Sequence, residues 1–120
     1  MRKKIIVFDF DGVIHSYTSG WQGIDVIPDK PVKGIRETLA ILMVDYKIIV
    51  VSSRCSESEG IAAIGDWLRE HDIKVDGIQA TKPAAFLTID DRAITFKGCE
   101  TLIDDIKNFK PYREDANKNG

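Results

Sequence analysis

Two acidic residues follow the most hydrophobic segment of the chain. Residues 5–8 read Ile-Ile-Val-Phe, and Asp9 and Asp11 come directly afterwards, one residue apart and just ahead of Gly12. Burial at the end of a strand disfavours charged carboxylates unless a cation compensates them. A few oxygen ligands of this kind suit Mg²⁺, which keeps waters and substrate phosphate in its remaining coordination positions. The acid pair therefore predicts a magnesium site.

Other polar residues stand at the ends of later apolar runs. Ser52 follows one such run. Asp90 and Asp91 follow another, and Lys82 stands shortly before it. A lysine adds a second positive charge, and a serine hydroxyl can donate a hydrogen bond to a phosphoryl oxygen. Together with the first two acids, these residues predict phosphoryl transfer, in which positioning and charge neutralisation supply most of the catalysis.

The pattern of apolar residues predicts the elements that position this set. Short apolar runs at 4–8 and 48–51 are typical of strands buried on both faces. Residues 75–79 predict a weaker strand, and residues 86–89 predict a stronger one. Helical spacing predicts three helices, the first from Val32 to Tyr46. The second starts with a capping box at 56–59 and buries Ile61, Ile64 and Leu68. The third ends before Pro111 and carries on one side Leu102, Ile103, Ile106 and Phe109. This alternation predicts an α/β fold with a central, mostly parallel sheet flanked by helices.

The expected sheet explains why the polar residues should meet. In a parallel α/β sheet, ligands bind in the crevice beyond the carboxyl ends of the strands. Both acid pairs and Ser52 stand at such ends. The sequence therefore predicts one site, built from several strand exits.

Composition and charge narrow the class of protein. The 120 residues suit one domain, and 17 basic against 19 acidic residues give a net charge of −2, which leaves no electrostatic footprint for nucleic acid. The apolar runs are far shorter than the ~20 residues that span a bilayer, and the basic start meets too short an apolar stretch for a signal peptide. Cys55 and Cys99 form no C-x-x-C pair, so reduced thiols and a cytoplasmic setting are expected.

Four short motifs add a family resemblance. The sequences DFDGV, VVSSR, TKP and IDDR, in this order, resemble the haloacid dehalogenase superfamily of phosphohydrolases over residues 5–96. The resemblance implies a three-layer Rossmann-like fold, with Asp9 as the nucleophile that forms an aspartyl-phosphate. It implies that Asp11 is the general acid and base and that its main-chain carbonyl binds the metal. Ser52 would bind the phosphoryl group, and Lys82 would steady the nucleophile and the phosphate.

The resemblance also assigns the second acid pair and the subclass. Asp90 and Asp91 would complete the Mg²⁺ site, and which of the two contacts the metal directly stays open. Family members that cleave carbon–halogen bonds lack a carboxylate at the position of Asp11, because their leaving group needs no proton. Asp11 therefore favours a phosphatase.

The sequence leaves no room for the cap domain that many family members carry. The segment between Asp11 and the first predicted helix has no helical period, and only one helix and one strand fit between Ser52 and Lys82. We therefore expect a single domain, residues 1–112, whose open site is covered only by a flap at about residues 14–33. An open site suits a large substrate, or a second subunit of a homo-oligomer that closes it. The polar tail, residues 113–120, is expected to be disordered.

Several residues near the site are candidates for substrate contacts. His15 and Trp21 lie in the flap, and Ser53 and Arg54 follow Ser52. Trp21 either anchors the flap on the core or stacks on a base or sugar. Arg54 either binds phosphate or forms a structural ion pair.

These observations predict a Mg²⁺-dependent phosphatase that acts on a phosphorylated small molecule or on the terminal phosphate of a larger substrate. One alternative is a nucleotidase or nucleic-acid end phosphatase, which the near-neutral charge weakens. Another is a non-catalytic module that binds metal or phosphate on the same fold. The intact set of acids, serine and lysine argues against that module.

Overall fold

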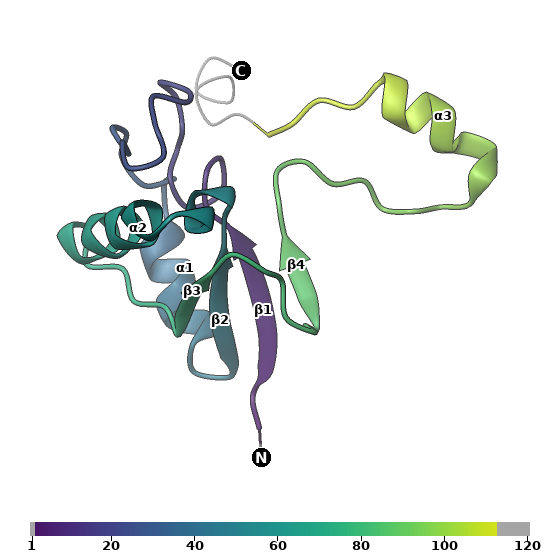
Figure 1. Ribbon diagram of the computed structural model, residues 1–120. Helices are drawn as coiled ribbons and strands as arrows, with labels where there is room; N and C mark the ends of the chain where they lie inside the picture. The colour runs from purple at the N-terminus through teal and green to yellow at the C-terminus, as the bar shows by residue number, and fades with distance from the viewer. Residues whose placement is uncertain (1, 113–120) are drawn as a thin grey trace.

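A computed structural model describes residues 2–112 of the chain, and the predicted tail at 113–120 lies outside them. The elements are β1 (Lys4–Asp9), α1 (Ile35–Leu42), β2 (Tyr46–Val51), the short 3₁₀ helix η1 (Ser53–Ser56), α2 (Ser58–Glu70), β3 (Gly77–Gln79), β4 (Leu87–Ile89) and α3 (Cys99–Lys107). The strands form one parallel sheet in the order β3-β2-β1-β4 (Figure 1). The predicted α/β, Rossmann-like fold is confirmed.

Strand β1 holds the central position that the site requires. It pairs with β2 from Lys4 opposite Tyr46 to Asp9 opposite Val51, and with β4 up to Phe8 opposite Ile89. The carboxyl ends of these three strands therefore lie side by side. As a result, the residues that follow them emerge at the same edge of the sheet.

The core lies between one face of the sheet and the helices α1 and α2. Alternate strand residues point to this face, as the pleat requires. The core includes Ile6, Phe8, Ile48 and Val50 from the strands, Leu39 from α1, and Ile64, Trp67 and Leu68 from α2. The chain between β3 and β4 then crosses the sheet to reach β4 on the far side of β1 (Figure 1).

The first helix is shorter than its apolar spacing predicts. It begins after Gly34, whose φ of 83° lies in the left-handed region, so Val32 stays outside it. It ends at Leu42, and Tyr46 already belongs to β2, where it lies opposite Lys4. The assignment of Tyr46 to a helix was wrong because its spacing from Leu42 fits a helix and a helix-turn-strand connection equally well.

The predicted capping box at residues 56–59 is also wrong. Residues 53–56 form η1, and the N-cap of α2 is Glu57, whose side chain makes no capping hydrogen bond. The side chain that does cap a helix here is Ser52, whose Oγ accepts a hydrogen bond from the Arg54 N–H at 3.1 Å. Helix α2 still buries Ile64 and Leu68 as predicted, but the prediction for Ile61 was wrong, because its side chain is 39% exposed.

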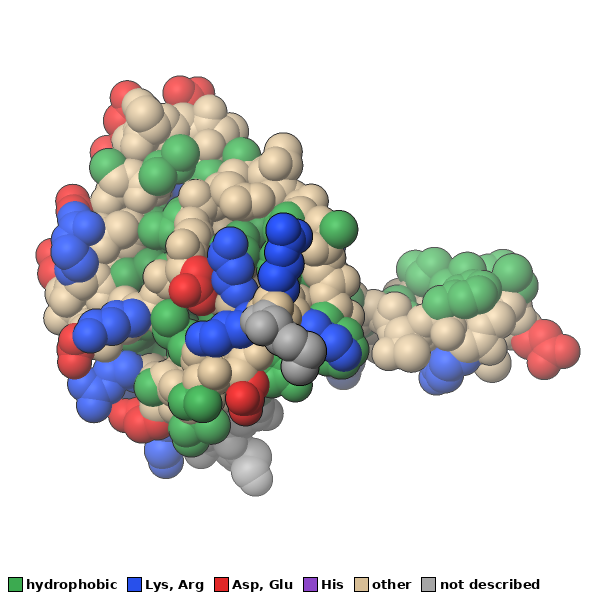
Figure 2. Space-filling model, turned by 90° about the horizontal axis from the view of Figure 1, so that it is seen from below, with side chains coloured by type: hydrophobic (Ala, Val, Ile, Leu, Met, Phe, Trp, Pro, Cys, Tyr) green, Lys and Arg blue, Asp and Glu red, His purple; other side chains and the backbone are tan. Residues whose placement is uncertain are grey.

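The last two elements form, but they are not buried as predicted. Leu87 and Ile89 of the edge strand β4 are 49% and 39% exposed. None of the residues of α3 is buried. This helix projects away from the sheet in Figure 1, and Figure 2 shows hydrophobic side chains on the projecting lobe.

Residues 2–112 contain neither a cap domain nor a helix that could span a membrane. No cap domain occupies either insertion point, since the chain from Phe10 to Gly34 forms no helix or regular strand and the stretch from Ser52 to Lys82 holds only η1, α2 and β3. None of the helices in this range is long and apolar enough to cross a membrane.

Candidate functional site

A cavity of about 350 Å³ opens at the carboxyl ends of β1 and β2. Its lining includes Asp9, Ser52, Ser53, Lys82 and Asp90, all of which the sequence placed at the site. Asp9 ends β1, the two serines follow β2, and Asp90 follows β4. The parallel sheet thus brings together residues that are far apart in the chain. No ion pair joins Lys82 to an acid among the described residues.

Asp9, Asp90 and Asp91 form an acidic group beside this cavity. One carboxylate oxygen from each lies within 4.8 Å of the others. Ligands on opposite sides of an octahedral Mg²⁺ ion are ~4.2 Å apart, because each Mg–O bond is about 2.1 Å. Three hard oxygen donors at this spacing fit Mg²⁺, with small adjustments and with positions left for water and phosphate.

Gly12 makes room for this acidic group. Its φ of 91° lies in the region that only glycine adopts readily. A Cβ built on Gly12 would lie 2.8 Å from the Asp91 Cγ, too close for a real contact. The sequence pattern placed Gly12 after the first acids but gave no sign that Asp91 packs on it.

The crowding of the carboxylates changes their protonation. Burial, and then the nearby Asp90 and Asp91, raise the pKa of Asp9 from 3.8 to about 7. Burial also raises the pKa of Asp91, and Asp90 adds to that rise. A divalent cation would offset the same repulsion and favour the charged forms of Asp9 and Asp91.

The carboxylate of Asp11 is turned to a different set of partners. Its Oδ1 lies 2.8 Å from His15 Nδ1 and accepts from Arg54 Nη2 at 3.2 Å, while its Oδ2 accepts from Arg54 Nε at 2.9 Å. Burial acts to raise the pKa of Asp11, but the hydrogen bonds from His15 and Arg54 outweigh it, and the pKa is lowered. Asp11 is therefore held in its charged form, outside the acidic group.

Arg54 and His15 do not meet solvent. Both side chains are completely buried. Of the two alternatives for Arg54, the structure shows the ion pair with Asp11. The burial of the His15 ring between Asp11 and Asp29 argues against the predicted direct substrate contact.

The flap carries one exposed aromatic residue and is anchored by another. Trp21 is 54% exposed, and the centre of its ring lies 4.6 Å from Arg54 Cζ. The anchoring contact comes from Trp67 of α2, whose Nε1 donates to the main-chain carbonyl of Asp29 at 3.0 Å. Sequence reasoning missed Trp67. The available signal was its position three residues after Ile64, on the buried side of the helix.

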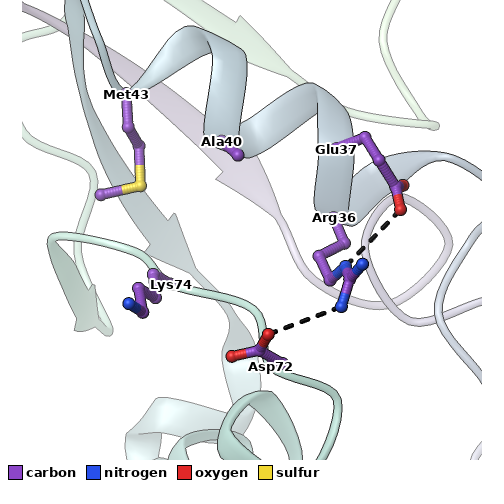
Figure 3. A pocket seen from close by; sticks show the side chains of 6 residues that line it. All are labelled: Arg36, Glu37, Ala40, Met43, Asp72 and Lys74. Carbon is purple, nitrogen blue, oxygen red and sulfur yellow. Dashed lines mark hydrogen bonds and ion pairs between the residues drawn. The ribbon is translucent and has the colours of Figure 1, made fainter.

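A second hollow lies away from the acids. It has a volume of about 490 Å³, lies between α1 and the turn after α2, and is lined by Arg36, Glu37, Ala40, Met43, Asp72 and Lys74 (Figure 3). Arg36 pairs with Glu37 and with Asp72, each at 3.5 Å. None of the residues predicted for the site lies here, and these paired surface charges are typical of a solvated face.

Comparison with known proteins adds no relative. No family model, no curated protein and no solved structure matches the chain. The functional interpretation therefore depends on the geometry of the site itself.

Proposed function

We propose that this chain is a cytoplasmic, Mg²⁺-dependent phosphatase of the haloacid dehalogenase type that hydrolyses a phosphate monoester through an aspartyl-phosphate on Asp9. One observation carries the proposal. Asp9, at the end of the central strand, lies in one cavity with Ser52 and Lys82 and in one acidic group with Asp90 and Asp91. That set offers a nucleophile, two groups for phosphate and a metal site.

Each residue has a role in this proposal. Asp9, Asp90 and Asp91 would hold Mg²⁺, together with the main-chain carbonyl of Asp11. A magnesium ion there would supply positive charge that offsets the repulsion between the carboxylates and an incoming phosphate dianion. Asp9 forms a bond to phosphorus as the bond to the leaving oxygen breaks, and water then hydrolyses the acyl phosphate. Ser52 donates to a phosphoryl oxygen, and Lys82 neutralises charge.

Asp11 enters the proposal as a base rather than as an acid. Its lowered pKa keeps it charged, so it can accept a proton from the attacking water, but only as a weak base. It is a poor proton donor to a leaving group for the same reason. We therefore expect substrates whose leaving oxygen departs without prior protonation to react fastest.

Hydrolysis of p-nitrophenyl phosphate with and without Mg²⁺ tests the proposal. Activity should require the metal and should fall to background in Asp9→Asn, which keeps the size of the side chain and removes its charge. Asp66→Asn, on the exposed side of α2, is the matched control and should keep its activity. A kcat of Asp9→Asn above about a tenth of wild type, a loss of only ~1.4 kcal/mol, would contradict nucleophilic catalysis by Asp9.

One observation favours a second candidate, a module that binds metal and phosphate with little turnover. The Asp11 carboxylate is engaged by His15 and Arg54 and is not aimed at the acidic group. Calorimetric binding of Mg²⁺ and inorganic phosphate, in a protein that turns over no ester of a good leaving group, would support this module over the enzyme.

A further inference from the structure

Arg54 connects Asp11 to the flap, residues 14–33. One edge of its guanidinium forms the fork on the Asp11 carboxylate described above. From the other edge, Nη1 donates to the main-chain carbonyls of Gly23, Ile24 and Val26, at 2.8, 3.0 and 3.1 Å. A single buried side chain thus holds both the acid after β1 and the far part of the flap.

His15 makes a second connection between the same two parts. Its Nε2 accepts a hydrogen bond from the main-chain N–H of Asp29 at 3.1 Å, and its Nδ1 faces Asp11 Oδ1 at 2.8 Å. The network therefore fits the neutral ring that carries its hydrogen on Nδ1. Asp29 in turn binds the first part of the flap, because its carboxylate accepts hydrogen bonds from Ser19 N and Oγ at 2.8 and 2.6 Å.

The main chain at Arg54 is itself fixed in place. Ser52 Oγ accepts a hydrogen bond from the Arg54 N–H, and Gly60 in the first turn of α2 packs directly on the Arg54 main chain. A Cβ at Gly60 would lie 2.6 Å from the Arg54 carbonyl carbon, so only glycine allows this approach. The connection between Asp11 and the flap therefore starts from a rigid point between β2 and α2.

We propose that Arg54 and His15 are positioning residues that couple the folded state of the flap to the orientation of the Asp11 side chain. Each of the two is then ordered only when the other is. When the flap is ordered, its carbonyls hold the guanidinium that orients Asp11. When Asp11 is charged and in place, it holds the guanidinium that orders the flap and supports the Trp21 ring. The catalytic consequence rests on the proposed phosphatase function, but the structural coupling does not.

Hydrogen exchange of the flap amides tests the coupling without any substrate. Asp11→Asn and Arg54→Lys should each speed exchange in a peptide spanning residues 16–31 by about tenfold or more, because each removes charge-assisted hydrogen bonds. A lysine keeps the charge but cannot form the fork. Exchange in α2 should stay as in wild type. Arg69→Lys, an exposed arginine on α2, and Asp9→Asn are the controls and should leave the flap unchanged.

The double variant decides whether the two residues act as one unit. If they do, Asp11→Asn with Arg54→Lys exchanges no faster than the quicker single variant, because the connection is already lost. The proposal would be overturned if the increases in exchange rate of the two single variants multiplied in the double variant. It would also be overturned if the flap exchanged at the wild-type rate in Asp11→Asn. The ¹⁹F signal of 5-fluorotryptophan at Trp21, assigned with Trp21→Phe, should shift in Arg54→Lys. This readout keeps the test decisive if Asp11→Asn does not fold, since an unchanged signal overturns the coupling.

The activity arm separates this proposal from the proposed function. With p-nitrophenyl phosphate, Arg54→Lys should lose about tenfold or more in kcat with little change in KM, the signature of an interaction needed in the chemical step. The Mg²⁺ midpoint should stay within about twofold of wild type, because Arg54 lies outside the acidic group. Full kcat in a variant with a disordered flap would overturn the positioning role. A wild type without turnover would instead overturn the phosphatase, and the exchange results would still stand.

Discussion

Gly12 meets two requirements at one position: a left-handed backbone and close contact with Asp91. Gly12→Ala would place a methyl group against Asp91 and displace it from Asp9 and Asp90. We expect Mg²⁺ affinity to fall by about 10–100-fold, the usual cost of disturbing groups that position metal ligands. Calorimetric titration of Mg²⁺ measures this loss.

Gly34→Ala is the matched control for that experiment. Gly34 has a similar φ of 83°, but a Cβ there would meet open space. Its alanine variant bears the same backbone strain without moving Asp91. If both variants lose Mg²⁺ affinity equally, backbone strain rather than contact with Asp91 is the cause.

The raised pKa of Asp9 makes the stability of the metal-free protein depend on pH. Between 3.8 and about 7, folded Asp9 keeps a proton that the unfolded chain has released. This stabilising contribution is fully present below pH 3.8 and is lost as the pH rises through about 7. Relative to Asp9→Asn, the wild type should therefore lose stability between about pH 4 and about pH 7. Urea unfolding of both proteins in EDTA measures the difference, and a difference independent of pH would contradict the assignment.

Individual site residues were predictable where a strand end determines their position. Asp9, Ser52 and Asp90 end or directly follow parallel strands, so their convergence follows from the sheet. Asp11 was not predictable in the same way. Two residues in an extended strand share a face, but β1 ends at Asp9 and the chain turns at Gly12, so the two carboxylates part. The sequence holds no signal for the burial of Arg54.

Elements were predictable to the extent that local pattern determines them. The apolar runs at 4–8 and 48–51 predicted β1 and β2, which are confirmed, because central strands are buried on both faces. The run at 86–89 also predicted a strand, yet β4 is an exposed edge strand. The amphipathic pattern of α3 predicted a helix correctly. It could not predict packing, since an apolar side does not specify what covers it.

The exposure of α3 leads to a prediction about stability. Ile64 of α2 is fully buried, whereas Ile106 of α3 is 58% exposed. Ile64→Ala should cost about 2–5 kcal/mol of unfolding free energy, because it leaves a cavity in the core. Ile106→Ala should stay within about 0.5 kcal/mol of wild type. Urea denaturation checks both values.

A larger loss at Ile106 would show that α3 packs in solution. The dependence of this stability loss on protein concentration would then identify the surface that covers α3. A loss that does not change on dilution indicates the chain's own sheet, and one that disappears on dilution indicates a second copy.

The whole molecule should respond to Mg²⁺ through its folding equilibrium. The ion binds carboxylates that only the folded sheet brings together, so it stabilises the native state by mass action. At a hundredfold excess over Kd the gain is about 2.7 kcal/mol. The Tm should rise with Mg²⁺ in the wild type and in Asp66→Asn, and the rise should be smaller in Asp9→Asn. A Tm that does not change at millimolar Mg²⁺ would contradict the metal site.

The exposed edge of strand β4 gives Asp90 and Asp91 a second role besides the proposed metal binding. Within the described residues it borders only β1, so its outer backbone groups have no strand partner, and Leu87 and Ile89 beside them are exposed. Such an edge is a template for aggregation, which natural proteins block with charges placed next to it. Asp90 and Asp91 follow this edge directly, so we expect their charges to protect it. Neutralising both to asparagine should therefore make the protein aggregate faster on warming, even in a buffer without any metal.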